Sequence, residues 1–220
     1  MAGLFTRLRA GAGAAWEEYV RHPFVEALAD GSLRREAFQE FLVQDYLFLI
    51  QYARAHALLA YKLEDLADIR AALDTAKALI EIEIPLHVKY CAGWGLAEAR
   101  MREAPPALEM LAYTRYVLEQ GLAGDALDLL AALAPCLAGY AEIGLWAARR
   151  AQPDNPYIDW IRTYTGEDYL ASVEAALAMI DRVGDALGAE ARLPRLQAVF
   201  TQATRLEAAF WRTGWREQAP

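Results

Sequence analysis

Residues 36–63 read EAFQEFLVQDYLFLIQYARAHALLAYKL, and this stretch decides the fold class. Apolar side chains recur in it at intervals of three and four residues, namely at Phe38, Phe41, Leu42, Tyr46, Leu49, Tyr52 and Ala53. This spacing is the period of an amphipathic helix and not the alternation of a strand. The preceding Asp30-Gly31-Ser32 combines a helix stop with a possible N-cap. The stretch therefore predicts one long helix.

The rest of the chain shows the same period. An upstream helix ends near Arg21-His22-Pro23, and further helices are expected at about residues 65–91, 105–121, 124–151, 156–164, 167–188 and 192–216. Glycine and proline punctuate the connections, and Gly188 and Pro194 are expected to separate the last two helices. The sequence contains neither an alternating β-branched run nor a hairpin dipeptide. We therefore expect an all-α, single-domain multi-helix bundle over residues 1–220.

Two prolines, Pro85 and Pro135, fall inside predicted helices. Each removes one backbone donor and crowds the carbonyl group four residues earlier, so each helix is expected to bend there. Curvature around the core is the ordinary cause of such a bend.

Composition excludes several classes of protein. The 22 basic residues are outnumbered by 30 acidic ones, the net charge is −8, and there are only three lysines, which argues against a nucleic-acid-binding surface. The longest uncharged stretch of the most apolar region, residues 129–141, is shorter than the roughly 18–20 residues of a bilayer span and predicts a buried core helix. No membrane association is expected. The N-terminal residues lack a signal-peptide pattern, and two cysteines make at most one disulfide, so we expect a cytoplasmic protein.

Two carboxylates interrupt apolar helix faces. Asp45 has Phe41, Phe48 and Leu49 as its neighbours one turn away, which indicates that the side chain is buried with a partner. Glu207 is followed at three and four residues by two aromatic side chains. Such surroundings favour the neutral carboxyl and raise its pKa, which suits a general acid; an exposed glutamate beside a half-buried tryptophan is the alternative.

Cys136 follows Pro135 in an apolar helix, with Tyr140 one turn further on the same face. An isolated cysteine in that setting is usually a small buried hydrophobic residue, and no histidine lies in a recognisable nucleophile setting. Glu83 and His87 share a helix face, but a di-iron bundle requires Glu-x-x-His pairs from different helices, so metal binding is not expected. The role of Glu81, Glu83 and His87 is left open.

Motifs along nearly the whole chain resemble the TenA / thiaminase II family, which has a heme-oxygenase-like helical fold. The residues that carry the resemblance are Trp16, His22-Pro23-Phe24, Gly31-Ser32-Leu33, Phe38, Gln44-Asp45, Glu83, His87, Tyr113, Leu133-Ala134-Pro135-Cys136, Tyr140, Trp160-Ile161-Arg162-Thr163-Tyr164, Glu207 and Phe210-Trp211. No single piece is specific, but all of them occur in the order and spacing of the family.

The resemblance implies a hydrolase of thiamin salvage that needs no cofactor. Members convert 4-amino-5-aminomethyl-2-methylpyrimidine to the hydroxymethyl pyrimidine and ammonia, and many also cleave thiamin itself. By resemblance, Cys136 is the nucleophile, Glu207 is the acid that protonates a ring nitrogen, and Asp45 binds the polar edge of the pyrimidine. Tyr113, Tyr140 and Tyr164 line the pocket, together with Phe48, where the family often has a tyrosine. Cys136 indicates the cysteine-bearing class of the family.

How the thiol loses its proton is not visible in the sequence. We consider Asp45 or a tyrosine network as contributors, and an Asp45 contribution predicts that Asp45→Asn shifts thiol alkylation to higher pH. Two other functions stay open: an oxidase of the same fold, of the di-iron or quinone-cofactor biosynthesis type, and a non-catalytic pyrimidine-binding protein. The resemblance also implies a homotetramer, and an aromatic-rich last helix, with Phe200, Phe210, Trp211 and Trp215, could supply an interface.

Overall fold

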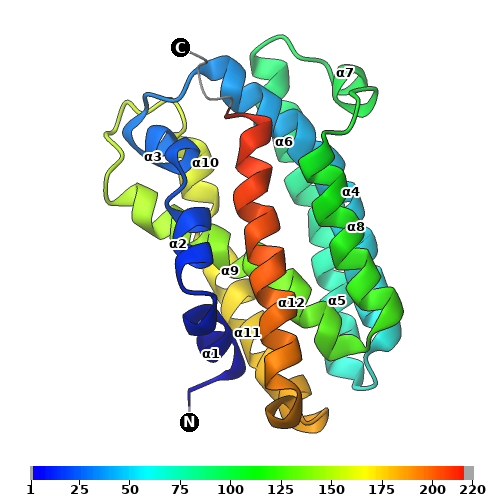
Figure 1. Ribbon diagram of the computed structural model, residues 1–220. Coiled ribbons are helices and arrows are strands. Elements are labelled where there is room, and N and C mark those ends of the chain that lie inside the picture. Colours follow the sequence, from blue (N-terminus) through cyan, green and yellow to red (C-terminus); the bar gives the residue numbers. More distant parts are fainter. Residues whose placement is uncertain (1, 216–220) are drawn as a thin grey trace.

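A computed structural model describes residues 2–215, and within that range every regular element is a helix (Figure 1). The all-α prediction is confirmed. In chain order the helices are α1 (Leu4–Ala12), α2 (Ala14–Val20), α3 (Pro23–Asp30), α4 (Arg35–Lys62), α5 (Leu66–Ala78), the π-helix η1 (Leu79–Glu83), α6 (Ile84–Gly93), α7 (Glu98–Arg102), α8 (Leu108–Ala123), α9 (Ala126–Ala148), α10 (Ile158–Thr163), α11 (Glu167–Ala186), α12 (Ala189–Phe210) and the 3₁₀ turn η2 (Trp211–Thr213).

Helix α9 is the central element of the bundle. It contacts α2, α3, α4, α8, α10, α11 and α12, and it lies behind α12 in Figure 1. A capping box begins it, in which the Asp125 carboxylate accepts the backbone N–H of Asp128 while the Asp128 carboxylate accepts that of Asp125. By length and composition α9 could cross a membrane, but 72% of its most apolar window is buried inside the structure. It is therefore a core helix, as the uncharged stretch predicted.

Helix α8 packs against both α4 and α12. On α4 the buried side chains include Phe41, Asp45, Phe48 and Tyr52, which are spaced by three or four residues and thus share one side of the helix. The long helix expected at residues 36–63 is confirmed almost to the residue.

The segment predicted as one helix at residues 65–91 contains a change of helix type. Helices α5 and α6 are joined by η1, in which the N–H of Ile84 bonds to the carbonyl of Leu79, five residues earlier. The bend expected at Pro85 takes this form because Pro85 has no N–H and the hydrogen-bond ladder shifts register before it. Pro135, in contrast, lies within the unbroken α9.

Three boundaries differ from the sequence prediction. The upstream helix is divided at Gly13, whose φ of 49° favours glycine. Helix α7 was not predicted. Pro194 does not separate the last two helices, because it lies inside α12, where packing against α1, α2 and α9 stabilises the helix around it. The predicted end of the last helix at residue 216 lies outside the described residues.

The aromatic residues of the last helical segment point inward. Phe200, Phe210 and Trp211 are 0%, 2% and 1% exposed, and Trp215 is half-buried. Trp16 stacks on Phe200 at 5.7 Å between ring centroids. Phe200, Phe210 and Trp211 already belong to the core, so the prediction that they supply a subunit interface is wrong for these three side chains, and for Trp215 it stays a prediction.

Candidate active site

Asp45 on α4 is paired with His87 on α6. The Asp45 Oδ2 to His87 Nε2 distance is 2.6 Å, and both side chains are almost fully buried. His87 Nδ1 lies 2.9 Å from the Glu83 carbonyl oxygen, which can only accept, so this nitrogen carries a proton. Burial lowers the pKa of His87, but the hydrogen bond and charge of Asp45 outweigh it and raise the pKa overall. The hydrogen bond with Asp45 thus favours the protonated form of His87.

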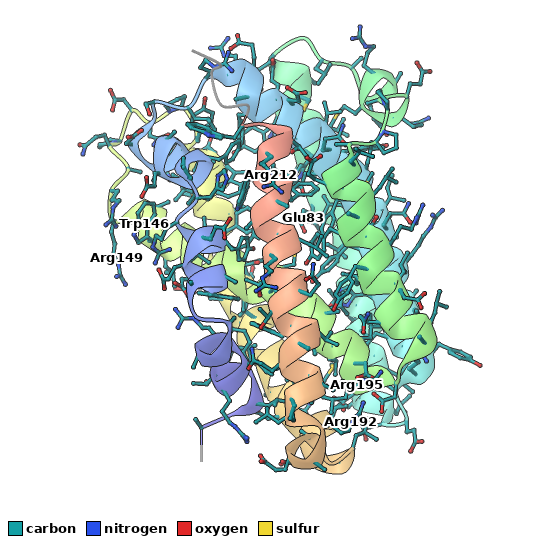
Figure 2. The ribbon with its side chains drawn as sticks, in the orientation of Figure 1. Glu83, Trp146, Arg149, Arg192, Arg195 and Arg212 are labelled. Atoms are coloured by element: carbon teal, nitrogen blue, oxygen red, sulfur yellow. The ribbon has the colours of Figure 1, made fainter. Side chains whose placement is uncertain are left out.

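The π-helix η1 presents Glu83 to the same region. Its carboxylate accepts a hydrogen bond of 3.0 Å from the Tyr164 hydroxyl, and Figure 2 shows Glu83 in the interior of the bundle. Burial raises the pKa of Glu83, the His87 charge lowers it in part, and the Asp45 charge raises it further. Glu81 is on the surface beside Lys77 and does not take part. The two glutamates are two residues apart and therefore point to different sides of the helix.

Glu207 on α12 forms the second carboxyl centre. Its side chain is 2% exposed and accepts a hydrogen bond of 2.8 Å from the Tyr113 hydroxyl on α8. Burial raises the pKa of Glu207 to about 8, although hydrogen bonds with Tyr113 and Cys136 lower it in part. At neutral pH this carboxyl is therefore mostly protonated, as a general acid requires.

Cys136 on α9 is half-buried and forms a hydrogen bond with Glu207. Burial raises the pKa of its thiol well above the ordinary value, and the charges of Glu207, Glu83 and Asp45 raise it further, while a hydrogen bond with Tyr52 lowers it. The resting group is thus a thiol. The expectation that Asp45 promotes the thiolate is wrong in sign, because a nearby carboxylate disfavours a second negative charge.

Aromatic side chains form the walls around these groups. Phe48 lies between the rings of Tyr52 and Tyr113, stacked at 5.2 Å on each. Tyr140 contacts Tyr164 at 5.0 Å between centroids. Burial raises the pKa of Tyr140, and the charges of Asp45 and Glu207 raise it further.

The structure brings every site residue predicted from the sequence into one interior cluster, to which α4, α8, α9, α12 and the short segment that ends at Tyr164 contribute. Sequence reasoning left His87 and Glu83 without a role, although their shared helix face was the available signal, and it did not identify Tyr52, two helical turns after Asp45. The described residues contain no group of three or more His, Cys, Asp or Glu side chains arranged to hold a metal ion.

The cluster is separate from the hollows on the surface. One hollow of about 530 Å³ is lined by Arg21, His22, Arg212, Trp215 and two neighbours, and another of about 220 Å³ lies between α4 and α8. None of the predicted site residues lines either hollow. The candidate active site is therefore an interior one.

Comparison with solved structures places the fold in a known class. A domain from Shewanella denitrificans OS217 described as having a heme oxygenase-like fold superimposes with a TM-score of 0.76, at 15% identity, over 96% of this chain and 91% of its own. The chain matches the TENA/THI-4/PQQC family model over residues 10–217, and it belongs to that family. The resemblance seen in the sequence is thereby confirmed.

Two similar proteins have informative descriptions. A chain from Silicibacter sp. TM1040, whose crystal structure is described as that of a TenA family transcription regulator, is 44% identical, with a TM-score of 0.92 over 96% of each chain. The aminopyrimidine aminohydrolase of Halalkalibacterium halodurans is 34% identical over 205 residues, which are 92% of this chain and 91% of that protein.

Proposed function

We propose that this chain is an aminopyrimidine aminohydrolase of thiamin salvage, which converts 4-amino-5-aminomethyl-2-methylpyrimidine to the hydroxymethyl pyrimidine and ammonia. One observation carries the proposal. The Cys136 thiol is hydrogen-bonded with Glu207, whose carboxyl is mostly protonated, and it lies near the Asp45–His87 pair, with aromatic side chains around these groups. The similarity to a named aminopyrimidine aminohydrolase supports the same reaction.

The substrate matches the shape and polarity of the site. An aminopyrimidine ring is flat with apolar faces, which suits Phe48 and the tyrosine rings. Its edge offers ring-nitrogen acceptors beside an amine donor. The Glu207 carboxyl donates a proton to a ring nitrogen, and the Asp45 carboxylate accepts from the exocyclic amine, so the two ends of the site have the two polarities that the edge requires.

Catalysis begins with a coupled proton movement. The Cys136 sulfur bonds to a ring carbon, its proton passes to Glu207, and Glu207 gives its own proton to the ring nitrogen. A water molecule gives a proton to the aminomethyl nitrogen, the ring electrons expel that nitrogen as ammonia, and the resulting hydroxide bonds to the methylene carbon. The ring nitrogen then returns its proton to Glu207, which passes a proton to the sulfur, and the sulfur leaves as the thiol. The sum is substrate plus water giving the hydroxymethyl pyrimidine and ammonia.

The same steps with a thiazole leaving group cleave thiamin, and we include this activity in the proposal. His87 holds the Asp45 carboxyl in place by its hydrogen bond, which makes it a positioning residue. Tyr113 positions Glu207 by its hydrogen bond. Tyr52 contacts the thiol and also donates to the Leu133 carbonyl at 3.0 Å, which keeps its hydroxyl near Cys136.

The test is ammonia release from the aminomethyl pyrimidine by the wild-type protein and by Cys136→Ser, with thiamin assayed in parallel. We expect the serine variant to lose a factor on the order of 10³ or more in turnover, while calorimetry shows that the hydroxymethyl pyrimidine still binds. Binding without any wild-type turnover would instead make the chain a pyrimidine-binding protein. Absence of both would refute the proposal.

We also propose a cytoplasmic homotetramer. Support comes from α5 and η1, where Leu66, Leu73 and Ile80 are spaced by seven residues and are 68%, 50% and 56% exposed. Such a stripe of apolar side chains is typical of a helix that packs against another subunit. Light scattering on the purified protein, compared with Leu73→Glu, gives the mass, and a monomeric wild-type protein would contradict this assembly.

A further inference from the structure

Tyr19 is held rigidly beside the site by contacts that leave its hydroxyl unused. Its ring is T-shaped against Trp16 at 5.7 Å and stacked at 6.3 Å on Trp211, whose Nε1–H donates to the Tyr19 carbonyl at 3.1 Å. The side chain is fully buried, and its hydroxyl oxygen has no hydrogen-bond partner within residues 2–215. A buried hydroxyl without a partner is costly, so this group calls for a ligand.

Gly139 on α9 determines where the hydroxyl points. A Cβ at residue 139 would overlap the Tyr19 ring and its oxygen, so only glycine lets the phenol lie against this turn of the helix. Gly139 follows Cys136 by three residues and shares its helix face, about 5–6 Å away. The Tyr19 hydroxyl therefore lies against α9 one helical turn after Cys136.

Three other buried polar atoms among the described residues have no partner, namely His56 Nδ1, Trp160 Nε1 and Thr213 Oγ1. The His56 ring lies 4.9 Å from that of Tyr52, and the Trp160 ring lies 4.6 Å from that of Tyr164, so both contact the aromatic walls of the site. Neither Nδ1 nor Nε1 can serve a substrate amine and a water in turn as a hydroxyl can, because Trp Nε1 only donates and burial lowers the pKa of His56 to about 4. Among the causes that raise the pKa of Tyr19, the charges of Glu207 and Cys136 follow directly after burial. Tyr19 is thus the unpartnered hydroxyl for which Gly139 and these charges indicate a position near Cys136.

We infer that the Tyr19 hydroxyl binds the substituent on the substrate methylene, first the leaving amine and then the water that replaces it. The inference rests on the proposed function, in which Asp45 and Glu207 are already occupied by the ring edge. A neutral phenol can donate to the amine and can accept from the water. Tyr19 gains and loses no net proton, since the proton that water gives up balances the one that ammonia takes.

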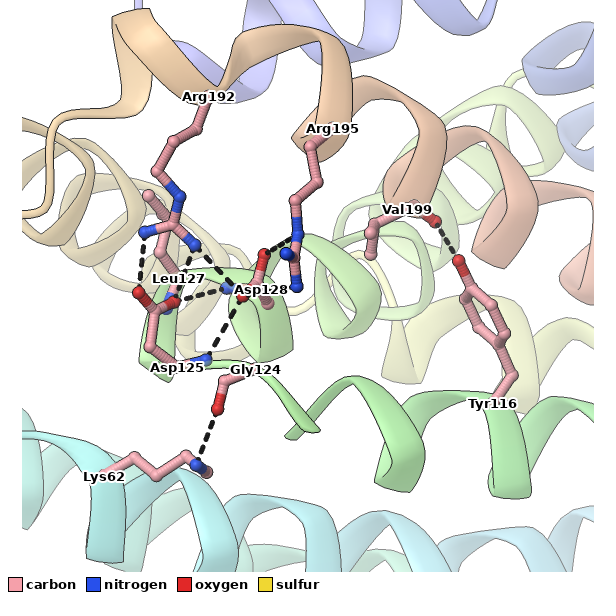
Figure 3. A network of polar contacts seen from close by, with 9 residues as sticks. All are labelled: Lys62, Tyr116, Gly124, Asp125, Leu127, Asp128, Arg192, Arg195 and Val199. Carbon is pink, nitrogen blue, oxygen red and sulfur yellow. Dashed lines mark hydrogen bonds and ion pairs between the residues drawn. The ribbon is translucent and has the colours of Figure 1, made fainter. Parts of the chain in front are cut away.

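Two pyrimidines that differ in one hydroxyl test this contact without turnover. They are 4-amino-5-hydroxymethyl-2-methylpyrimidine and 4-amino-2,5-dimethylpyrimidine, each titrated calorimetrically into wild type, Tyr19→Phe and Tyr116→Phe. Tyr116 is the matched control because its hydroxyl donates to the Val199 carbonyl at 3.3 Å, away from the site (Figure 3). Phenylalanine at position 19 keeps every ring contact.

We expect Tyr19→Phe to lower the affinity for the hydroxymethyl compound about five- to tenfold and the affinity for the dimethyl compound less than twofold. Tyr116→Phe should change neither affinity. If Tyr19→Phe weakens both compounds equally, or neither, the hydroxyl does not contact the substituent and the inference is overturned while the proposed function stands. If neither compound binds the wild-type protein, the proposed function fails and this inference with it.

Discussion

Buried carboxylates occur in two regions of this molecule with opposite surroundings. Where α9 begins, Asp128 is bound by two arginines from α12, with Arg192 Nη2 at 3.0 Å and Arg195 Nε at 3.1 Å (Figure 3). Its neighbour Asp125 also pairs with Arg192 at 2.6 Å. In the candidate site Glu207, equally buried, has a tyrosine hydroxyl and a thiol as partners and forms no ion pair with an arginine or lysine of the described chain.

The difference lies in whether a permanent cation is present. Burial acts to raise the pKa of Asp125, but Arg192 outweighs it and the pKa is lowered, so that carboxylate stays ionised. Glu207 lacks a cation, and its pKa rises to about 8. Asp45 is intermediate, because its cation is His87, which can itself titrate. Arginine thus keeps the partly exposed Asp125 ionised, whereas the buried Glu207, which has no cation beside it, is left able to exchange a proton.

Removing the titratable cation should have the largest effect on stability. His87→Leu leaves Asp45 buried without a partner, and we expect the free energy of unfolding to fall by about 3–5 kcal/mol at pH 7. Adding Asp45→Asn in the same chain removes the stranded charge and should restore part of the loss. Urea denaturation of both variants measures this. A loss below about 1 kcal/mol for His87→Leu would show that the pair is not ionised.

Replacing Glu207 by a neutral side chain should stabilise the protein instead of destabilising it. The folded protein keeps the Glu207 proton at pH values where the unfolded chain, with a pKa near 4.5, has lost it, so wild-type stability falls as pH rises from about 4.5 to about 8. Glu207→Gln avoids this and should be more stable by about 2–3 kcal/mol at pH 7, with the difference vanishing near pH 4.5.

Turnover should also depend on pH through the protonation of Glu207. Because Glu207 must carry a proton, wild-type turnover should fall as the pH rises above about 8, and Glu207→Gln should be inactive. Denaturation and ammonia release measured from pH 5 to 9 check both effects. A stability difference that is independent of pH would mean that Glu207 is ionised throughout.

The smallest effect is expected in the arginine-paired region. Arg192→Met keeps the packed aliphatic stem but removes the bonds to Asp125 and Asp128, and Arg195 still binds Asp128. We expect a loss of about 1–2 kcal/mol with unchanged turnover per folded molecule. The exposed Arg205→Met on the same helix is the control and should change neither quantity. A loss of turnover in Arg192→Met would show that the arginine-paired region affects the candidate active site, and would contradict this expectation.

The positions of the site residues were predictable because each lies at a helical spacing that the sequence displays. Asp45, Phe48 and Tyr52 share one face of α4 by their separations alone, and the apolar surroundings of Glu207 indicated a raised pKa. Their roles came from a resemblance to a family, which the family match supports. Their contacts did not follow from spacing, since Glu207 meets Tyr113 across 94 residues and Asp45 meets His87 across 42.

The sequence by itself determined the all-α class, the bounds of α4 and the burial of α9, because hydrophobic period and helix ends depend on neighbours within a few residues. Only the tertiary structure decided that the aromatic residues of α12 face the core, that η1 turns Glu83 inward, and that the Tyr19 hydroxyl lies beside the Cys136 turn without a partner. Those outcomes, like the charge state of each buried carboxyl, depend on which side chains from distant parts of the sequence lie next to the residue. Helical periodicity does not predict such contacts.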